Sequence, residues 1–241
     1  MEPSQYLAAV RADSARLLTA ARAAGLDAPV PSCPDWTVAD LLGHVGQVQR
    51  WQADLIARRV QSAEFSLAEP PTDPAVLVAW VEDASALLVE VLAATDPSVA
   101  VWTFAGPGTA AFWFRRQAHE AACHRVDAEL AAGVVPVVDP ELARDGIDEF
   151  LELAVGGLLR ERLAGSGETV HLHRTDGEGE WMIRRGPDGP AVTHEHAKGD
   201  VAARGSASDL LLALRGRIGT GALEVFGDAG VLERFVDDAR L

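Results

Sequence analysis

A helical repeat of apolar residues runs through the first two thirds of this sequence and sets its fold class. In each of four segments, apolar residues recur every three or four positions, which is the repeat of an amphipathic α-helix. The segments cover residues 6–25, 38–60, 74–95 and 109–132. Thr37 can cap the second helix with Asp40 in its first turn, and Pro74 stands where the third begins. Four such helices joined by loops predict a bundle, and a fifth helix at about 139–163 follows it.

The pattern changes after Gly165. Three stretches then alternate apolar and polar residues as short antiparallel strands do, with Gly-rich turns between them. They read "TVHLHRT", "EWMIRRG" and "AVTHEHA". A helix, a strand and a second helix are expected in the remainder. The sequence therefore predicts a mainly α protein with two domains, a helical bundle at residues 1–164 and a small α+β domain at residues 165–241.

Composition and charge narrow the classes of partner. With 48% hydrophobic residues and mixed charges, the chain is typical of an ordinary folded protein. The net charge of −15 and the lack of a Lys/Arg cluster argue against a nucleic-acid partner, because neutralising phosphates needs a basic surface. The amino-terminal stretch lacks the apolar core of a signal peptide, and no apolar run approaches the ~20 residues that span a bilayer. We expect a cytoplasmic protein without a membrane partner.

The fourth predicted helix carries an unusual group of polar residues, "RRQAHEAACHRVDAE" at 115–129. Residues four apart on an α-helix differ by about 40° around its axis, so Glu120 and His124 present a carboxylate and an imidazole side by side. His119 is about 140° away from His124 and cannot easily join this pair. Cys123 also lies off that face. Two ligands for one metal ion are therefore predicted here.

A third ligand has to come from another helix, and His44 is the candidate. It lies about two turns into the second helix, and its apolar neighbours Leu41 and Val45 indicate that this side faces the bundle interior. A His/Glu/His set from two helices leaves coordination positions open for water or substrate, as in catalytic zinc sites. The alternative is that Glu120 and His124 form a solvated helix pair and that His44 is a hydrogen-bonded core histidine.

Three stretches together carry a family resemblance: "SCPDWTVADLLGHV" (32–45), "HEAACHRVD" (119–127) and "GSASDLLLALRGR" (205–217). They resemble the mycothiol-dependent maleylpyruvate isomerase family. The resemblance implies a DinB-like, metal-binding four-helix bundle followed by a small α/β domain related to sterol carrier proteins. Residue by residue, it puts the metal ligands of the family on His44, Glu120 and His124.

The resemblance also implies an activity and its cofactors. A divalent metal, with zinc as the expected ion, would bind mycothiol or a similar low-molecular-weight thiol as thiolate. The protein would then be an isomerase or a thiol S-transferase acting on a small electrophile such as maleylpyruvate. Cys33 and Cys123 are expected to be reduced and structural. Arg217 is the expected catalytic residue that holds a substrate carboxylate, with Arg215 as its local rival. The alternative for Arg217 is an exposed arginine at a helix end.

Other interpretations remain open at this level. The bundle could hold a metal without this activity while the second domain binds a ligand or partner, or the protein could be a metal-dependent hydrolase. The pairs His171/His173 and His194/His196 each lie on one face of a predicted strand. Four imidazoles would form a second metal site if those strands were neighbours, and exposed strand histidines are the alternative. The sequence leaves the substrate, the metal and the oligomeric state open.

Overall fold

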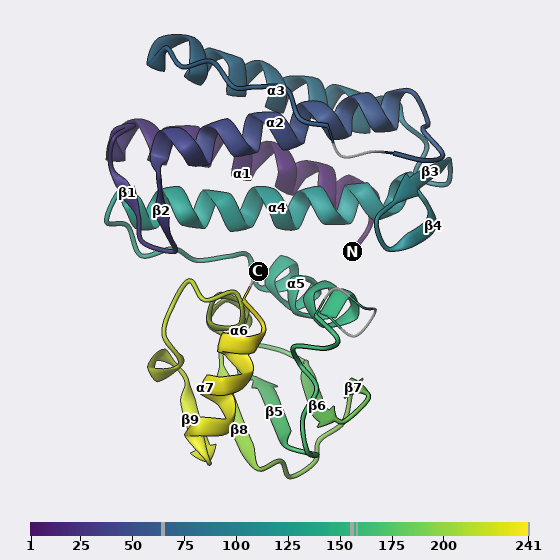
Figure 1. Cartoon of the computed structure of the whole chain (residues 1–241), viewed down its shortest axis with the longest axis vertical. Coiled ribbons are helices and arrows are strands. Elements are labelled where there is room, and N and C mark those ends of the chain that lie inside the picture. Colours follow the sequence, from purple (N-terminus) through teal and green to yellow (C-terminus); the bar gives the residue numbers. More distant parts are fainter. Residues whose placement is uncertain (64–65, 155–156, 158, 241) are drawn as a thin grey trace. The chain divides into compact units, whose positions relative to one another are not determined.

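The computed structural model describes residues 1–63, 66–154, 157 and 159–240, which form two compact units, Met1–Pro136 and Val137–Leu241 (Figure 1). The predicted division at 164/165 therefore falls inside the second unit. The fifth predicted helix belongs to this second unit, where it packs against another helix of the same unit. Within the described residues, no helix is both long enough and apolar enough to cross a membrane.

The first unit is the predicted four-helix bundle. Its helices are α1 (Pro3–Ala24), α2 (Val38–Ala57), α3 (Pro74–Ala94) and α4 (Ala110–Ala131). Helix α1 packs along α4, and α2 packs along α3. The predicted capping box at the start of α2 is present, because the Thr37 hydroxyl accepts from the Asp40 backbone N–H while the Asp40 carboxylate accepts from the Thr37 backbone N–H. These local signals fix where α2 begins and so which residues face α4.

Two short hairpins in the first unit were not expected from the sequence. Strand β1 (Pro29–Val30) pairs with β2 (Cys33–Thr37), and β3 (Ala100–Thr103) pairs with β4 (Gly106–Thr109). Strands β1, β2 and β4 contain Pro or Gly, which obscures the strand pattern, and β3 has only four residues. Strand β2 leads directly into α2 and places Trp36 beside the first turns of that helix. The first hairpin therefore forms part of the connection between α1 and α2, and the second forms part of the connection between α3 and α4.

The second unit combines a mixed sheet with helices. Its elements are α5 (Pro140–Leu153), β5 (Thr169–Arg174), β6 (Glu180–Gly186), β7 (Gly189–Thr193), β8 (Val201–Gly205), α6 (Ala207–Leu214), the 3₁₀ turn η2 (Thr220–Ala222), β9 (Glu224–Gly227) and α7 (Ala229–Asp238). The sheet order is β7-β6-β5-β8-β9, in which β5 and β8 are parallel and the other neighbours antiparallel. Helices α6 and α7 pack against β5 and β8.

Three details of this unit differ from the sequence prediction. Helix α5 ends at Leu153, and residues 155, 156 and 158 of the predicted helix lie outside the described residues. Strand β8 was not foreseen, because its sequence "VAARG" lacks a clear alternation. Strand β7 ends at Thr193, so the "HEH" stretch lies in the connection that leads to β8 and not in a strand. This last difference decides where His194 and His196 lie.

Candidate metal centre

Helices α2 and α4 bring the three predicted ligands together in the first unit. His44 comes from α2, Glu120 and His124 come from α4, and one ligand atom of each lies within 4.8 Å of the others. Glu120 Oε2 is 3.1 Å from His124 Nε2. The rings of His44 and His124 meet edge-on with their centroids 5.0 Å apart. The arrangement is that of two imidazoles and one carboxylate converging on one point, which is a donor set that suits a divalent metal.

Asp127 fixes the orientation of the His124 ring. Its Oδ2 lies 3.0 Å from His124 Nδ1, and its Oδ1 accepts a hydrogen bond of 2.6 Å from the Ser32 hydroxyl. Asp127 is fully buried, one turn beyond His124 on α4. A carboxylate on one ring nitrogen turns the other nitrogen toward the ligand point, as in the carboxylate–histidine–zinc pattern. The sequence analysis missed this role, although the three-residue spacing in "HRVD" was visible.

Arg116 and Trp36 each contact one of the three candidate ligands. The Arg116 guanidinium donates a 2.7 Å hydrogen bond to Glu120 Oε1, which leaves Oε2 directed at His124. Because Arg116 is itself buried, it holds the carboxylate in one rotamer. The Trp36 ring lies with its centroid 5.0 Å from that of His44. Both ligands therefore have a neighbour that limits their freedom before any ion binds.

The two histidines differ in charge in the metal-free protein. Burial lowers the pKa of His124, but the hydrogen bonds with Asp127 and Glu120 outweigh it and raise the pKa to about 10. Burial and then the nearby His124 lower the pKa of His44. At neutral pH, His44 is therefore a neutral imidazole with a free lone pair, while His124 carries a proton that a cation would replace.

Other polar residues near this group lie outside it. The 4.8 Å group does not include His119, whose ring packs edge-on against Tyr6. Cys33 and Cys123, both within the described residues, form no disulfide and do not join the group. Their predicted structural role and reduced state are compatible with this arrangement.

Arg217 lies in the turn after α6 in the second unit. Its guanidinium donates a 2.7 Å hydrogen bond to the Arg215 carbonyl, and the side chain is half-buried. The Arg215 guanidinium lies over the Phe150 ring, 5.5 Å from its centroid. Arg215 thus has a packing role, and a carboxylate-binding role for Arg217 stays a prediction.

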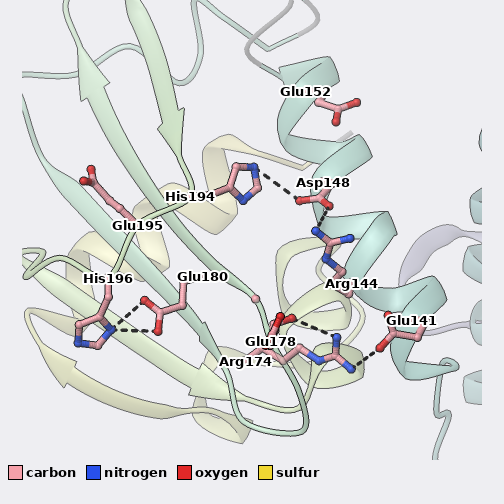
Figure 2. A pocket seen from close by; sticks show the side chains of 11 residues that line it. Glu141, Arg144, Asp148, Glu152, Arg174, Glu178, Glu180, His194, Glu195 and His196 are labelled. Atoms are coloured by element: carbon pink, nitrogen blue, oxygen red, sulfur yellow. Dashed lines mark hydrogen bonds and ion pairs between the residues drawn. The ribbon is translucent and has the colours of Figure 1, made fainter. Parts of the chain in front are cut away.

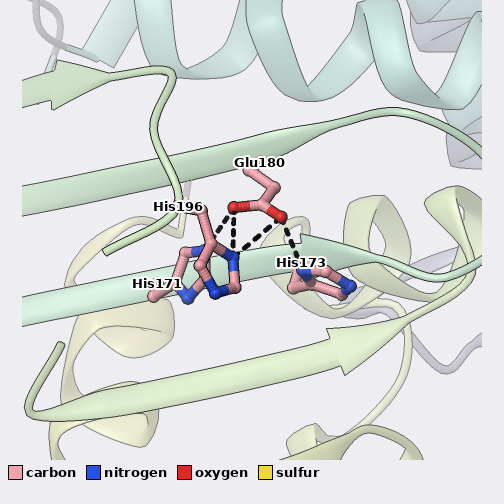
Figure 3. A group of neighbouring side chains, drawn as sticks. All are labelled: His171, His173, Glu180 and His196. Carbon is pink, nitrogen blue, oxygen red and sulfur yellow. Dashed lines mark hydrogen bonds and ion pairs between the residues drawn. The ribbon is translucent and has the colours of Figure 1, made fainter. Parts of the chain in front are cut away.

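A second group of potential ligands lies on the sheet of the second unit. It consists of His171, His173, Glu180 and His196 (Figure 3). The fourth predicted histidine, His194, is not part of it and lies 3.9 Å from Asp148 instead (Figure 2). The predicted set of four imidazoles is therefore corrected to three imidazoles and a carboxylate, because the "HEH" stretch is not in an extended strand. Glu180 had not been predicted as a ligand.

The fold and the bundle site together define a class of protein: a helical bundle with a His/Glu/His candidate metal centre, followed by a small α/β unit. The model of the mycothiol maleylpyruvate isomerase N-terminal domain matches residues 7–129, and that of the MDMPI C-terminal domain matches residues 141–234. The chain therefore belongs to the mycothiol maleylpyruvate isomerase family. The second match begins with α5, in agreement with the division of the two units.

Solved structures show the same fold at low sequence identity. Two crystal structures of the mycothiol-dependent maleylpyruvate isomerase, one of them of a mutant, match with TM-scores of 0.63 and 0.64. In both cases 93% of each chain is covered at 15% identity. The ubiquinone synthesis protein UbiJ-SCP2 covers 43% of this chain at 22% identity with a TM-score of 0.29, too low to establish a shared fold. The likeness of the second unit to sterol carrier proteins thus stays a prediction. No curated protein matches the chain significantly.

Proposed function

We propose that this protein is a metal-dependent enzyme that uses mycothiol, or a similar low-molecular-weight thiol, either to isomerise a small electrophile such as maleylpyruvate or to transfer the thiol to it. The observation that carries the proposal is the convergence of His44, Glu120 and His124 within 4.8 Å, on helices of the family's amino-terminal domain. Membership of the family and the likeness to the crystal structures of the maleylpyruvate isomerase support the choice of reaction.

Some residues of the bundle would bind the ion directly, and others orient these ligands. His44, Glu120 and His124 would hold a divalent metal, for which zinc is the expected ion. Asp127 keeps Nε2 of His124 aimed at the ligand point, and Arg116 binds Oε1 of Glu120 while Oε2 faces His124. Three protein ligands leave a position open, as in catalytic zinc sites. When bound, the ion would lower the pKa of an incoming thiol and hold it as the nucleophilic thiolate.

The reaction itself needs no nucleophile from the protein. The thiolate adds its sulfur to one carbon of a cis double bond, and the neighbouring carbon takes up a proton equivalent to the one that the thiol gave up. The former double bond is then single and rotates. Loss of a proton from that carbon and of the thiolate restores the double bond in the trans form, and the thiolate with this proton regenerates the thiol. In S-transfer, the adduct is released instead. Neither Cys33 nor Cys123 is required in this scheme.

A substrate that carries carboxylates also requires a cationic partner. Arg217 is our choice for this role, because a guanidinium binds a carboxylate through two parallel hydrogen bonds. The choice rests on the "SASDLLLALRGR" stretch of the second unit, which is one of the three stretches that resemble the family.

The test of the proposed function is an assay of zinc-loaded protein with maleylpyruvate and with an uncharged electrophile, each in the presence and absence of mycothiol. We expect turnover that requires both zinc and thiol. Turnover that does not need thiol would favour a metal-dependent hydrolase. Stoichiometric zinc without turnover on either electrophile would favour a metal-binding module whose second unit binds a ligand or a partner.

A further inference from the structure

Strand pairing places three side chains of the sheet group on one face. His171 and His173 are two residues apart on β5, so both point to the same side of the sheet. Glu180 begins β6 and lies directly opposite His173 in the antiparallel register. Residues directly opposite each other in an antiparallel pair share a face. The sheet alone therefore assembles two imidazoles and a carboxylate.

The connection between β7 and β8 brings the fourth side chain. Strand β7 ends at Thr193, which pairs with Met182, and Met182 pairs in turn with His171. Strand β8 begins beyond β5, on the other side of the sheet order, with Val201 paired to Val170. The chain must cross β6 and β5 at the level of His171 to reach it. His196 lies in this crossing, beside His171 and Glu180 (Figure 3).

The distances within the group are close to those of a four-ligand metal site. Glu180 Oε2 lies 3.2 Å from His171 Nε2 and 2.8 Å from His196 Nδ1, and Glu180 Oε1 lies 2.9 Å from His173 Nδ1. The ligand atoms of all four residues lie within 4.8 Å of one another. In a tetrahedral zinc site with bonds of about 2.0–2.1 Å, ligand atoms are about 3.3 Å apart. The three contacts of Glu180 are therefore already near the spacing of such a site.

All three imidazoles of this group converge on one carboxylate. Nδ1 of His173 is buried and lies 2.9 Å from Glu180 Oε1. The other two imidazoles contact the same carboxylate. A cation at the centre would take one ligand atom from each of the four residues and balance the charge of Glu180.

The surroundings also favour a cation. Glu180 and His196 line a pocket of about 830 Å³ that lies between α5 and the β6–β7 side of the sheet (Figure 2). Carboxylates outnumber guanidinium groups in its lining, and Arg144 and Arg174 are paired with Asp148 and Glu141. The pocket is therefore an acidic entry path that leads to the ligand group.

We propose that the second unit binds one divalent transition-metal ion of the zinc class through His171, His173, Glu180 and His196. Imidazole and carboxylate ligands suit zinc and similar ions better than calcium or magnesium, which prefer oxygen. Four protein ligands fill a tetrahedral site, so the ion has a structural role and fastens the β7–β8 connection to the sheet. The inference is independent of the function proposed for the bundle.

The decisive experiment counts zinc per chain after reloading metal-stripped, full-length protein. His196→Ala is the informative variant, because this side chain is 77% exposed and its loss should not disturb folding. His194→Ala is the matched control, because this histidine lies two residues away and its side chain is also largely exposed, at 62%.

In a His44→Ala/His124→Ala background, which removes the bundle ligands, we expect one zinc per chain. Adding His196→Ala should weaken it by more than the roughly 10–100-fold cost of losing an outer-shell partner, whereas adding His194→Ala should not.

Thermal unfolding provides a second readout. In the same bundle-variant background, zinc at about 100 times its Kd should raise Tm by roughly 10 °C, and His196→Ala should abolish this shift. If the His44→Ala/His124→Ala protein does not fold, His196→Ala in the otherwise wild-type chain should lower the zinc content by one ion per chain. The proposal is overturned if the bundle variant binds no zinc while folded, or if His196→Ala retains the full zinc content and the full Tm shift. Neither outcome depends on whether the bundle is catalytic.

Discussion

The two histidine groups of this chain use similar side chains in different frameworks. In the bundle, the ligands lie on two long helices, and the ring of His124 is oriented by Asp127, which Ser32 holds in turn. In the sheet, the ligands come from two strands and a connection, and His196 is largely exposed. The first group has three ligands and an open side, whereas the second can fill a tetrahedral site by itself. The number of ligands, and not the number of histidines, therefore separates the candidate reaction centre from the candidate structural site.

The largest expected effect is the loss of a bundle ligand. His124→Ala should remove the bundle zinc and lower thiol-dependent turnover by about 100-fold or more, because a three-ligand site depends on each ligand. His44→Ala and Glu120→Ala should act alike. Zinc content by elemental analysis and thiol-dependent rates measure both effects. Cys123→Ser, adjacent on the same helix, is the control and should keep both within a few-fold. Full bundle zinc in a folded His124→Ala protein would remove that residue from the site.

Substitution of Arg217 tests whether the second unit contributes more than a structural site. Arg217→Met should raise KM or lower kcat for a dicarboxylate substrate, by the ~2–5 kcal/mol expected for a desolvated charge pair. Steady-state kinetics on a dicarboxylate and on an uncharged electrophile separate this role from a general defect. The uncharged substrate should be much less affected and the zinc content unchanged. Equal losses on both substrates would show that Arg217 is structural.

Asp127 distinguishes the bundle group from the sheet group, because only in the bundle does a described buried carboxylate orient a ligand from behind. Asp127→Asn keeps the size of the side chain and removes its charge. We expect bundle zinc affinity to fall by roughly 10–100-fold, as is typical for the loss of an outer-shell carboxylate. Competition with a chelator of known affinity measures the change, in a His196→Ala background so that the bundle alone responds. An unchanged affinity would show that Asp127 does not position His124.

Taken per pH unit, the dependence of bundle zinc affinity on pH should be the smallest of these effects. His124 has its pKa raised from 6.5 to about 10 on folding, so its charge stabilises the metal-free protein fully below about pH 6.5. This contribution is lost as the pH rises toward 10. Zinc has to displace the same proton, so bundle affinity should rise by up to about tenfold per pH unit between 7 and 9. Calorimetry in buffers of different ionisation enthalpy should detect one released proton. Zinc binding without proton release would contradict the assigned charge of His124.

Local sequence signals account for most of the bundle and its site. The capping box at Thr37 and Asp40 places α2, and the four-residue spacing of Glu120 and His124 is a property of one helix. These inferences need no knowledge of the tertiary structure. By contrast, Asp127 owes its position partly to Ser32 in a distant loop, 95 residues away in sequence. The spacing of residues on α4 could suggest that contact but could not establish it.

The sheet was harder to predict because its geometry depends on pairing. That Glu180 faces His173 follows from the β5–β6 register, which the alternation of residues does not specify. His194 and His196 were assigned to a strand, but the chain leaves β7 at Thr193 to cross the sheet. The predicted domain boundary lies inside the second compact unit for a similar reason, because an amphipathic helix such as α5 does not reveal which partner covers its apolar face. Contacts between residues far apart in the sequence determine the strand register, the end of β7 and the partner of α5.

The most direct test of the central claim compares turnover in two variants, each missing one histidine group. Zinc-loaded His44→Ala/His124→Ala protein and zinc-loaded His196→Ala protein would be assayed with maleylpyruvate and mycothiol beside the wild type, with kcat/KM and zinc per chain measured on the same samples. We predict that the bundle variant loses thiol-dependent turnover, while the sheet variant keeps kcat/KM within a few-fold of wild type. Retained turnover in the folded bundle variant, or its loss in the folded sheet variant alone, would contradict the assignment of the reaction to the bundle.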